Sequence, residues 1–274
     1  MTTTPHTLPA RPGATAQRVT LARVVRSEWT KLRSVPSTAW SLLAAAVLIV
    51  GFGALYSVLR VTRPPSDPAT LATFDPTAVS LTGVQLAQLA VGVLGVLLVA
   101  GEYATGTIRG SLAAVPRRLP VLWAKAIVLA LTTLVLCLPA VLAAFLVGQS
   151  ILSAERLDTT LSDPGVARAV LGSALLLSAV GLLGLGLGAV ARNTAAGVAA
   201  LFGLLFGPQL LTGLLPAAWS DTLYPYLPVP AGAAVASARP DPTALGPWSG
   251  FALFCLYTAV ILGLAAWRLR HRDA

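Results

Sequence analysis

The sequence predicts an all-α integral membrane protein with six transmembrane helices and both termini in the cytoplasm. Of its 274 residues, 56% are hydrophobic and 11% are charged, whereas a soluble domain has about a quarter of its residues charged. The apolar residues gather in runs of about 20, which is the length that crosses roughly 30 Å of hydrocarbon. The cations concentrate in alternate connections between these runs.

Two different segments precede the first apolar run. Residues 1–17 are rich in Thr, Pro and Ala and have no apolar period, which predicts a disordered tail. Residues 18–34 have apolar side chains at spacings of three and four between cations: Leu21, Val25 (with Val24), Trp29 and Leu32. A basic helix with one apolar face and a tryptophan is typical of a segment in the membrane interface. We expect an amphipathic interfacial helix, with an ordinary positively charged flank as the alternative.

Residues 35–274 form one membrane domain. Its predicted spans are 39–59, 79–100, 121–147, 170–191, 195–215 and 251–267. Only Arg192, Asn193 and Thr194 separate the fourth run from the fifth, and the two together are far too long for one crossing. They therefore predict a tight helical hairpin. We expect Pro208 to kink the fifth span.

Counting charged residues gives the orientation. With both termini on one side, that side holds 14 of the 19 cations and 3 of the 10 acids, and the other side holds the remaining 5 cations and 7 acids. Cytoplasmic loops carry the excess of Lys and Arg, so the termini are predicted to be cytoplasmic. Trp40, Trp123 and Trp267 then fall at the cytoplasmic ends of spans, as an aromatic belt requires.

The spans hold almost no group that could power or catalyse a reaction. They contain no Asp, Glu, His or Arg, and Lys125 is near enough to the cytoplasmic end of its run to snorkel. Carriers driven by ions usually need such groups at mid-membrane, which disfavours a self-powered carrier. The two cysteines lie in separate runs, and neither lysine belongs to a phosphate loop. We predict no catalytic, cofactor-binding or metal-binding residue.

Small residues suggest close helix packing in two spans. Gly184 and Gly188 are four residues apart, as are Gly203 and Gly207. Such pairs let helices approach closely, so packing within the subunit is the first interpretation and a dimer seam is the alternative. In the longest outer loop, 216–248, a patch of small residues at 231–238 could form a short re-entrant or interfacial helix or remain a plain loop.

The densest polarity between two spans lies at 101–125. Charges there must sit in water or headgroups, because each would cost several kcal/mol in hydrocarbon. We expect a helix break followed by a short amphipathic segment that Pro116 ends, with Glu102 and Arg109 able to pair across the turn. The residues that we single out in this loop are Glu102, Gly106, Thr107, Arg109, Arg117 and Arg118.

At these residues the chain resembles the permease subunits of type-2 ATP-binding cassette (ABC) transporters, particularly the small six-span bacterial kind. The resemblance covers nearly the whole chain. It rests on RSEWTKLRS at 26–34, GEYATGTIR at 101–109 with PRR at 116–118, and YLP at 226–228.

The resemblance implies partners and residue roles. In that family two permease chains are thought to pair with two copies of a separate ATPase. A coupling helix in the loop after span two contacts the ATPase. Carried over, Glu102, Gly106, Thr107 and Arg109 belong to the coupling element, and Trp29, Lys31 and Arg33 to an interfacial connecting helix. From the residues alone, Glu102 could instead be a boundary carboxylate, Arg117 and Arg118 ordinary positive-inside residues, and Glu28 and Lys31 a surface pair.

We therefore expect the permease subunit of an ATP-driven ABC transporter in a bacterial plasma membrane. It would export a lipid-like or amphipathic substrate and be coupled through 101–125 to an ATPase that binds the ATP. It would form a homodimer or pair with a similar permease, contact membrane lipids and bind no nucleic acid, since its cations form no single patch. The alternative is a non-transporting scaffold or sensor that binds a cytoplasmic partner. A channel ranks third because no polar ring lines a span.

Overall fold

The structure is a computed structural model that describes residues 20–63, 67, 70, 74–107, 119–239 and 243–271. These residues form helices and turns, with no strand among them, which confirms the all-α class. A first helix, α1 (Leu21–Ser34), precedes six that are long and apolar enough to cross a membrane. These are α2 (Pro36–Thr62), α5 (Gly83–Thr105), α7 (Leu119–Leu152), α8 (Val166–Ala191), α9 (Thr194–Thr212) and α12 (Pro247–His271). The N-terminal tail lies outside the described residues.

The second and fifth spans differ from their predicted boundaries. Residues 76–80 form a separate helix, α4 (Pro76–Ser80), because the Asp75 carboxylate caps it by accepting the Thr77 and Ala78 N–H groups at 2.9 and 3.2 Å. The span itself starts at Gly83, where any Cβ would lie 2.3 Å from the Leu48 carbonyl oxygen of α2. The predicted start was early because α4 continues the apolar run. The fifth span ends at Thr212 rather than at residue 215.

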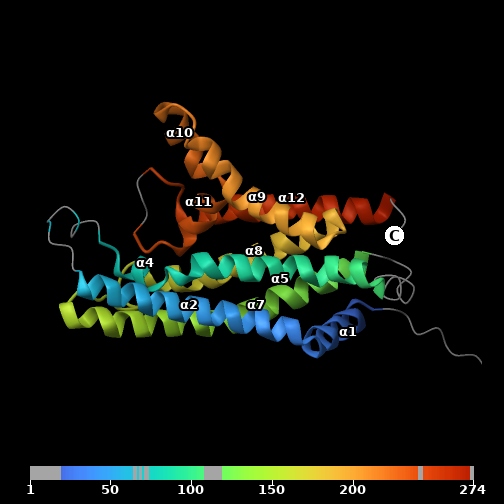
Figure 1. Cartoon of the computed structure of the whole chain (residues 1–274), viewed down its shortest axis with the longest axis horizontal. Helices are drawn as coiled ribbons and strands as arrows, with labels where there is room; N and C mark the ends of the chain where they lie inside the picture. Colours follow the sequence, from blue (N-terminus) through green and yellow to red (C-terminus); the bar gives the residue numbers. More distant parts are fainter. Residues whose placement is uncertain are drawn as a thin grey trace, which may run out of the picture.

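Helix α8 lies at the centre of the bundle. It contacts α5, α7, α9 and α12, while α2 packs on α5 and α7 (Figure 1). The described ends of the chain, α1 and the end of α12, lie at the same end of the bundle in Figure 1, as an even number of spans requires. The predicted hairpin at Arg192 and Asn193 is confirmed between α8 and α9.

Glycines bring α5 and α8 into backbone contact. A Cβ on Gly184 would lie 2.1 Å from the Gly92 carbonyl oxygen, and one on Gly188 would lie 2.7 Å from that of Val96. Packing within the subunit is therefore confirmed for the pair on α8. It is wrong for Gly203 and Gly207 of α9, because their side of α9 faces away from the bundle and a Cβ on either would meet no described residue within 4 Å.

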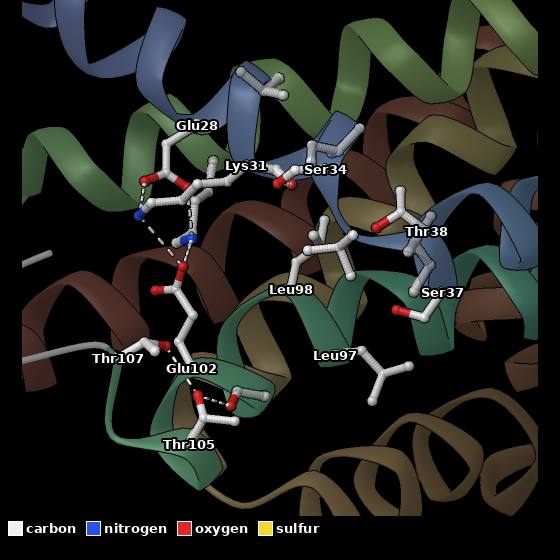
Figure 2. A pocket seen from close by; sticks show the side chains of 16 residues that line it. Glu28, Lys31, Ser34, Ser37, Thr38, Leu97, Leu98, Glu102, Thr105 and Thr107 are labelled. Carbon is white, nitrogen blue, oxygen red and sulfur yellow. Dashed lines mark hydrogen bonds and ion pairs between the residues drawn. The ribbon is translucent and has the colours of Figure 1, made fainter. Parts of the chain in front are cut away.

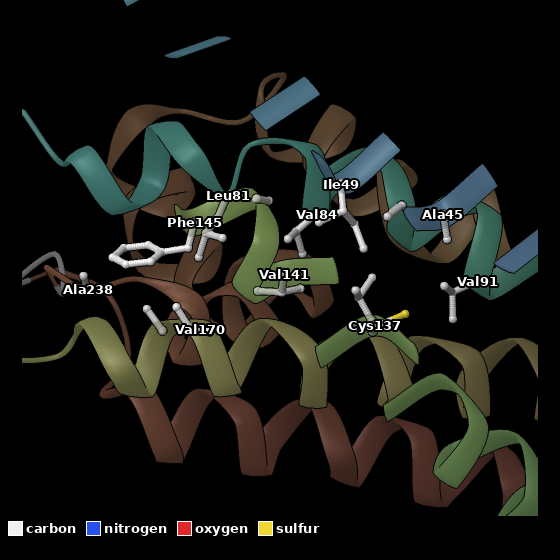
Figure 3. Close-up of a cluster of buried hydrophobic side chains, with 14 of the residues drawn as sticks. Ala45, Ile49, Leu81, Val84, Val91, Cys137, Val141, Phe145, Val170 and Ala238 are labelled. Atoms are coloured by element: carbon white, nitrogen blue, oxygen red, sulfur yellow. The ribbon is translucent and has the colours of Figure 1, made fainter. Parts of the chain in front are cut away.

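An apolar core fixes the half of the bundle away from α1. Side chains of α2, α5, α7 and α8 meet there around Phe145 and Ile49, which are fully buried (Figure 3). The lone thiol of Cys137 packs among them as a small apolar group. Next to this core, the Gln149 side chain of α7 donates to the Ser80 hydroxyl at 2.8 Å and accepts the Thr159 N–H at 2.8 Å.

The described residues of the predicted outer loop form four short helices. They are α10 (Ala217–Leu223), η2 (Tyr224–Tyr226), α11 (Pro228–Ala233) and η3 (Ala234–Ala236), and η1 (Ser153–Glu155) follows α7. The small-residue patch thus begins in helix rather than plain loop. It packs on α8 and α12, and Arg168 of α8 donates to the carbonyls of Val235 and Ala238 at 3.4 and 3.5 Å.

Candidate functional site

The end of α5 places Glu102 one turn before a helix break. Gly106 caps α5 with φ 72°, a left-handed conformation that favours glycine, and its N–H donates to the Tyr103 carbonyl. The Thr105 hydroxyl donates to the Gly101 carbonyl at 3.0 Å and lies 2.9 Å from the Thr107 hydroxyl. The predicted break at 105–107 is therefore confirmed.

Four charged side chains meet beside this helix end. Lys125 Nζ of α7 donates to Glu28 Oε2 of α1 and to Glu102 Oε1 of α5, each at 2.6 Å. Lys31 Nζ of α1 lies 2.7 Å from Glu28 Oε1 and 3.5 Å from Glu102 Oε1. Figure 2 shows Glu102 extended toward the two ammonium groups. We call Glu28, Lys31, Glu102 and Lys125 the ion cluster, and it holds both lysines of the chain.

The ion cluster is electrically neutral and largely buried. The Lys125 and Glu28 side chains are each 6% exposed, Glu102 is 16% exposed and Lys31 is 41% exposed. Charged side chains are buried this deeply only when they are paired with opposite charges, because an isolated buried group would lose its charge by a change in protonation. Burial lowers the pKa of Lys31, but the hydrogen bond and charge of Glu28, with those of Glu102, outweigh it and raise that pKa above 10.5.

Helix α1 brings Glu28 to the cluster by packing on α7. Its buried residues are Val24, Glu28 and Leu32, which follow one another at spacings of four. Of the predicted apolar face, Val24 and Leu32 are buried against the bundle, whereas Leu21 and Trp29 are 46% and 41% exposed. The placement of α1 in the membrane interface stays a prediction. The side of α1 that packs on α7 includes the Glu28 carboxylate, whose partner Lys125 lies 97 residues away in the sequence.

A cavity of about 850 Å³ opens beside the ion cluster. All four cluster residues line it, together with leucines of α5 and hydroxyl residues at the α1–α2 junction: Leu94, Leu97, Leu98, Ser34, Ser37 and Thr38. In Figure 2 the charged groups occupy one side and Leu97 and Leu98 the other. The cavity thus has a charged end and an apolar wall. Glu102 Oε2 is buried and accepts no hydrogen bond from a described residue.

The predicted site residues have different positions. Glu102 and Lys31 belong to the ion cluster, and Gly106 and Thr107 follow Glu102 at the helix end. Trp29 and Arg33 lie on the exposed side of α1, where the Arg33 guanidinium is 5.9 Å from the Trp29 ring centroid. The remaining predicted residues, Arg109, Arg117 and Arg118, lie outside the described residues, as does the expected pair of Glu102 with Arg109.

Sequence reasoning missed two members of the cluster. Lys125 was interpreted as a snorkelling residue, and Glu28 only as a surface partner of Lys31. One signal could have found them: the chain has only two lysines, one before the first span and the other just inside the third, both on the predicted cytoplasmic side. Glu28 and Glu102 are predicted on the same side, so the two lysines and the two glutamates could have been expected to pair.

Comparison with protein families identifies the family of this chain. A family model described as ABC-2 family transporter protein matches residues 24–207, which include the ion cluster and the first five spans except the end of α9. A comparison with curated proteins finds no match.

Proposed function

The chain belongs to the ABC-2 family of transporter proteins, and we propose that it is the permease subunit of an ATP-driven exporter worked by a separate cytoplasmic ATPase. Membership of the family makes it a multi-pass membrane protein and a transport component rather than an enzyme. Permeases of this family pair with an ATPase subunit. In our proposal that partner binds and hydrolyses the ATP, and the membrane is a bacterial plasma membrane.

The ion cluster is the observation that carries this proposal. It ties the helices on either side of the 106–118 connection to α1, which leads through Val35 directly into α2. A push on the connection displaces the ends of α5 and α7. Helix α1 then follows, because leaving a buried charge without its partner costs about 3–5 kcal/mol. A force applied to one connection would thereby move three spans together.

The partner surface is proposed at the connection itself. Residues 106–118 carry Arg109, Arg117 and Arg118, which suit an acidic surface of the ATPase. On α1, the exposed Trp29 and the neighbouring Arg33 suit the headgroup region, where amphipathic rings and cations are stabilised. Lys31 connects this helix to the coupling element through the ion cluster.

The cavity supports an amphipathic cargo. Its volume of about 850 Å³ lies within the range of pockets that enclose small ligands. The leucine wall would hold an alkyl chain, and Glu102 Oε2 would accept a hydrogen bond from an ammonium or hydroxyl headgroup. The cavity adjoins α1 on the side predicted to be cytoplasmic, so the proposed direction is export.

Pairing with a second permease is proposed at the exposed helices. Leu210 and Leu211 of α9 are 73% and 64% exposed, and Gly203 and Gly207 beside them have no neighbour. A second copy or a similar permease would cover this surface. Lipid covering it instead would leave a monomer, which crosslinking in membranes can distinguish.

The experiment that tests the proposal is co-reconstitution with the cognate ATPase into vesicles. Fluorescent phosphatidylethanolamine is the first probe, and its movement between leaflets is followed by dithionite quenching. We expect ATP-dependent movement that stops when the ATPase cannot hydrolyse ATP. A stable complex that hydrolyses ATP but moves neither this probe, a fluorescent alkylamine nor a labelled peptide would favour the non-transporting scaffold.

A further inference from the structure

In the last turn of helix α5, two consecutive residues contact different parts of the molecule. Glu102 belongs to the ion cluster with α1 and α7. Tyr103 lies against Arg192, whose Cζ is 5.5 Å from the tyrosine ring centroid, within the range of a cation–π interaction. Arg192 forms the turn between α8 and α9. The end of α5 therefore contacts that turn as well as α1 and α7.

Arg192 is also tied to the end of α12. Its Nη2 donates to the Arg268 carbonyl at 3.4 Å, and Arg268 Nη1 donates in return to the Val190 carbonyl at 2.8 Å. Val190 is among the last residues of α8, whose carbonyls have no partner within the helix. Each arginine thus donates a hydrogen bond to a backbone carbonyl near the C-terminus of the other arginine's helix. Helix C-termini are partly negative, so both cations are stabilised there. The two bonds fasten the α8–α9 turn to α12.

The backbone of Arg192 has a conformation that is unusual for arginine. Its φ is 55° and its ψ is 15°, in the left-handed region that favours glycine. Asn193 then caps α9 by accepting the Ala196 N–H at 3.0 Å. Glycine would form this turn with less strain, so the turn itself does not require the guanidinium. Residues kept in such conformations are concentrated at functional positions.

We propose that Arg192 is a positioning residue that passes movement of the α5 end to α9 and α12; this rests on the proposed function. Tyr103 and Arg192 make the first link, and Arg192 and Arg268 make the second. The ion cluster serves α1 and α7, so Glu102 and Tyr103 together connect one ATPase-driven helix end to both halves of the bundle. Helix α9 continues toward α10, and α11 packs on α12. The contacts of Arg192 with Tyr103 and Arg268 therefore extend the connection from α5 to the outer loop.

Amide hydrogen–deuterium exchange of the full permease bound to its ATPase in nanodiscs tests this. The nucleotide-free and vanadate-trapped complexes are compared. In the natural sequence we expect trapping to change exchange in α1 and the start of α7, and also in the α8–α9 turn and the end of α12. In Arg192→Gly the first change remains and the second is lost. Tyr103→Leu gives the same loss, whereas Tyr103→Phe, which keeps the ring face, retains both.

Arg156→Gly is the matched control. Arg156 has φ 56° at the end of η1, so this variant relieves the same backbone conformation far from Arg192, and both responses should persist. The proposal is overturned if the α8–α9 turn and α12 still respond in Arg192→Gly, or if Arg156→Gly abolishes their response equally. Absence of any nucleotide response in α1 and α7 of the unmodified complex contradicts the proposed function, and the relay with it.

Discussion

Lys125 is the residue on which the ion cluster depends most. It bonds to carboxylates of two other helices and is 6% exposed, whereas Lys31 contacts the same carboxylates at 41% exposure. Removing the buried cation leaves Glu28 and Glu102 facing each other with only Lys31 to offset them. Removing Lys31 leaves their strongest partner in place. The two lysines of the chain should therefore contribute unequally.

We predict that Lys125→Met lowers the free energy of unfolding by about 3–5 kcal/mol. Lys31→Met should lower it by about 1 kcal/mol or less, because exposed ion pairs contribute little. Thermal unfolding in detergent, followed by circular dichroism, measures both. Arg33→Met, on the exposed side of α1, is the control and should have no measurable effect. Equal losses in the two lysine variants would mean that Lys125 is not the buried centre of the cluster.

The pH dependence of the Lys31 contribution follows from the sign of its pKa shift. The folded-state pKa is raised above 10.5, so the stability that Lys31 contributes is fully present below that pH and is lost only as pH rises through the higher folded value. We expect the difference in melting temperature between the natural chain and Lys31→Met to stay constant from about pH 6 to pH 9. A titration of that difference near neutral pH would contradict the pairing.

At the scale of elements, glycines bring α5 and α8 into backbone contact, whereas no described residue covers Gly203 and Gly207 of α9. We predict that Gly184→Ala destabilises the permease by about 1–3 kcal/mol or more, because its Cβ would lie 2.1 Å from a backbone oxygen that cannot move aside freely. Gly203→Ala should be neutral or slightly stabilising, since Ala is the better helix former. Melting temperatures of the two variants make the comparison. Equal destabilisation would indicate that the side of α9 that carries Gly203 is covered within the subunit.

The six spans and α1 were predictable because each depends on a local property. Run length identifies a span, and the hairpin between α8 and α9 follows from 46 residues that one crossing cannot hold. The face that α1 buries was not predictable, since Glu28 finds its partner Lys125 at a distance of 97 residues. Likewise α4 is set by a single capping carboxylate, Asp75, which precedes the apolar run of the second span.

The site was predictable as a region but not as a set of contacts. The polarity of 101–125 identified Glu102 and the break at Gly106. Its partners could not be read from spacing, because which helix ends meet is decided by packing across the bundle. The contact between Tyr103 and Arg192 was missed for the same reason: Arg192 was predicted only as part of the hairpin turn, and the contact exists only once α5 and α8 pack together.

At the scale of the whole molecule, the two ends of the bundle are held differently. Charged side chains join the helices at the end near α1, through the ion cluster and the Arg192–Arg268 clamp. At the other end, beside the apolar core, hydrogen bonds to neutral groups join the helices: those of Gln149 with Ser80 and Thr159, and those of Arg168 with the Val235 and Ala238 carbonyls. This asymmetry fits a machine that receives force at one end and transmits it along rigid helices to the other.

The central claim is that the ATPase works the permease through Glu102, and the ratio of ATP hydrolysed to probe lipid moved in reconstituted vesicles tests it most directly. Glu102→Gln keeps the side chain's shape but removes its charge, and Glu155→Gln, at an exposed glutamate in η1, is the matched control. We predict that Glu102→Gln continues to hydrolyse ATP while probe movement falls by about tenfold or more, since a charge-assisted hydrogen bond is worth about 1.5–3 kcal/mol. Glu155→Gln should keep the natural ratio. An unchanged ratio in Glu102→Gln would contradict the claim.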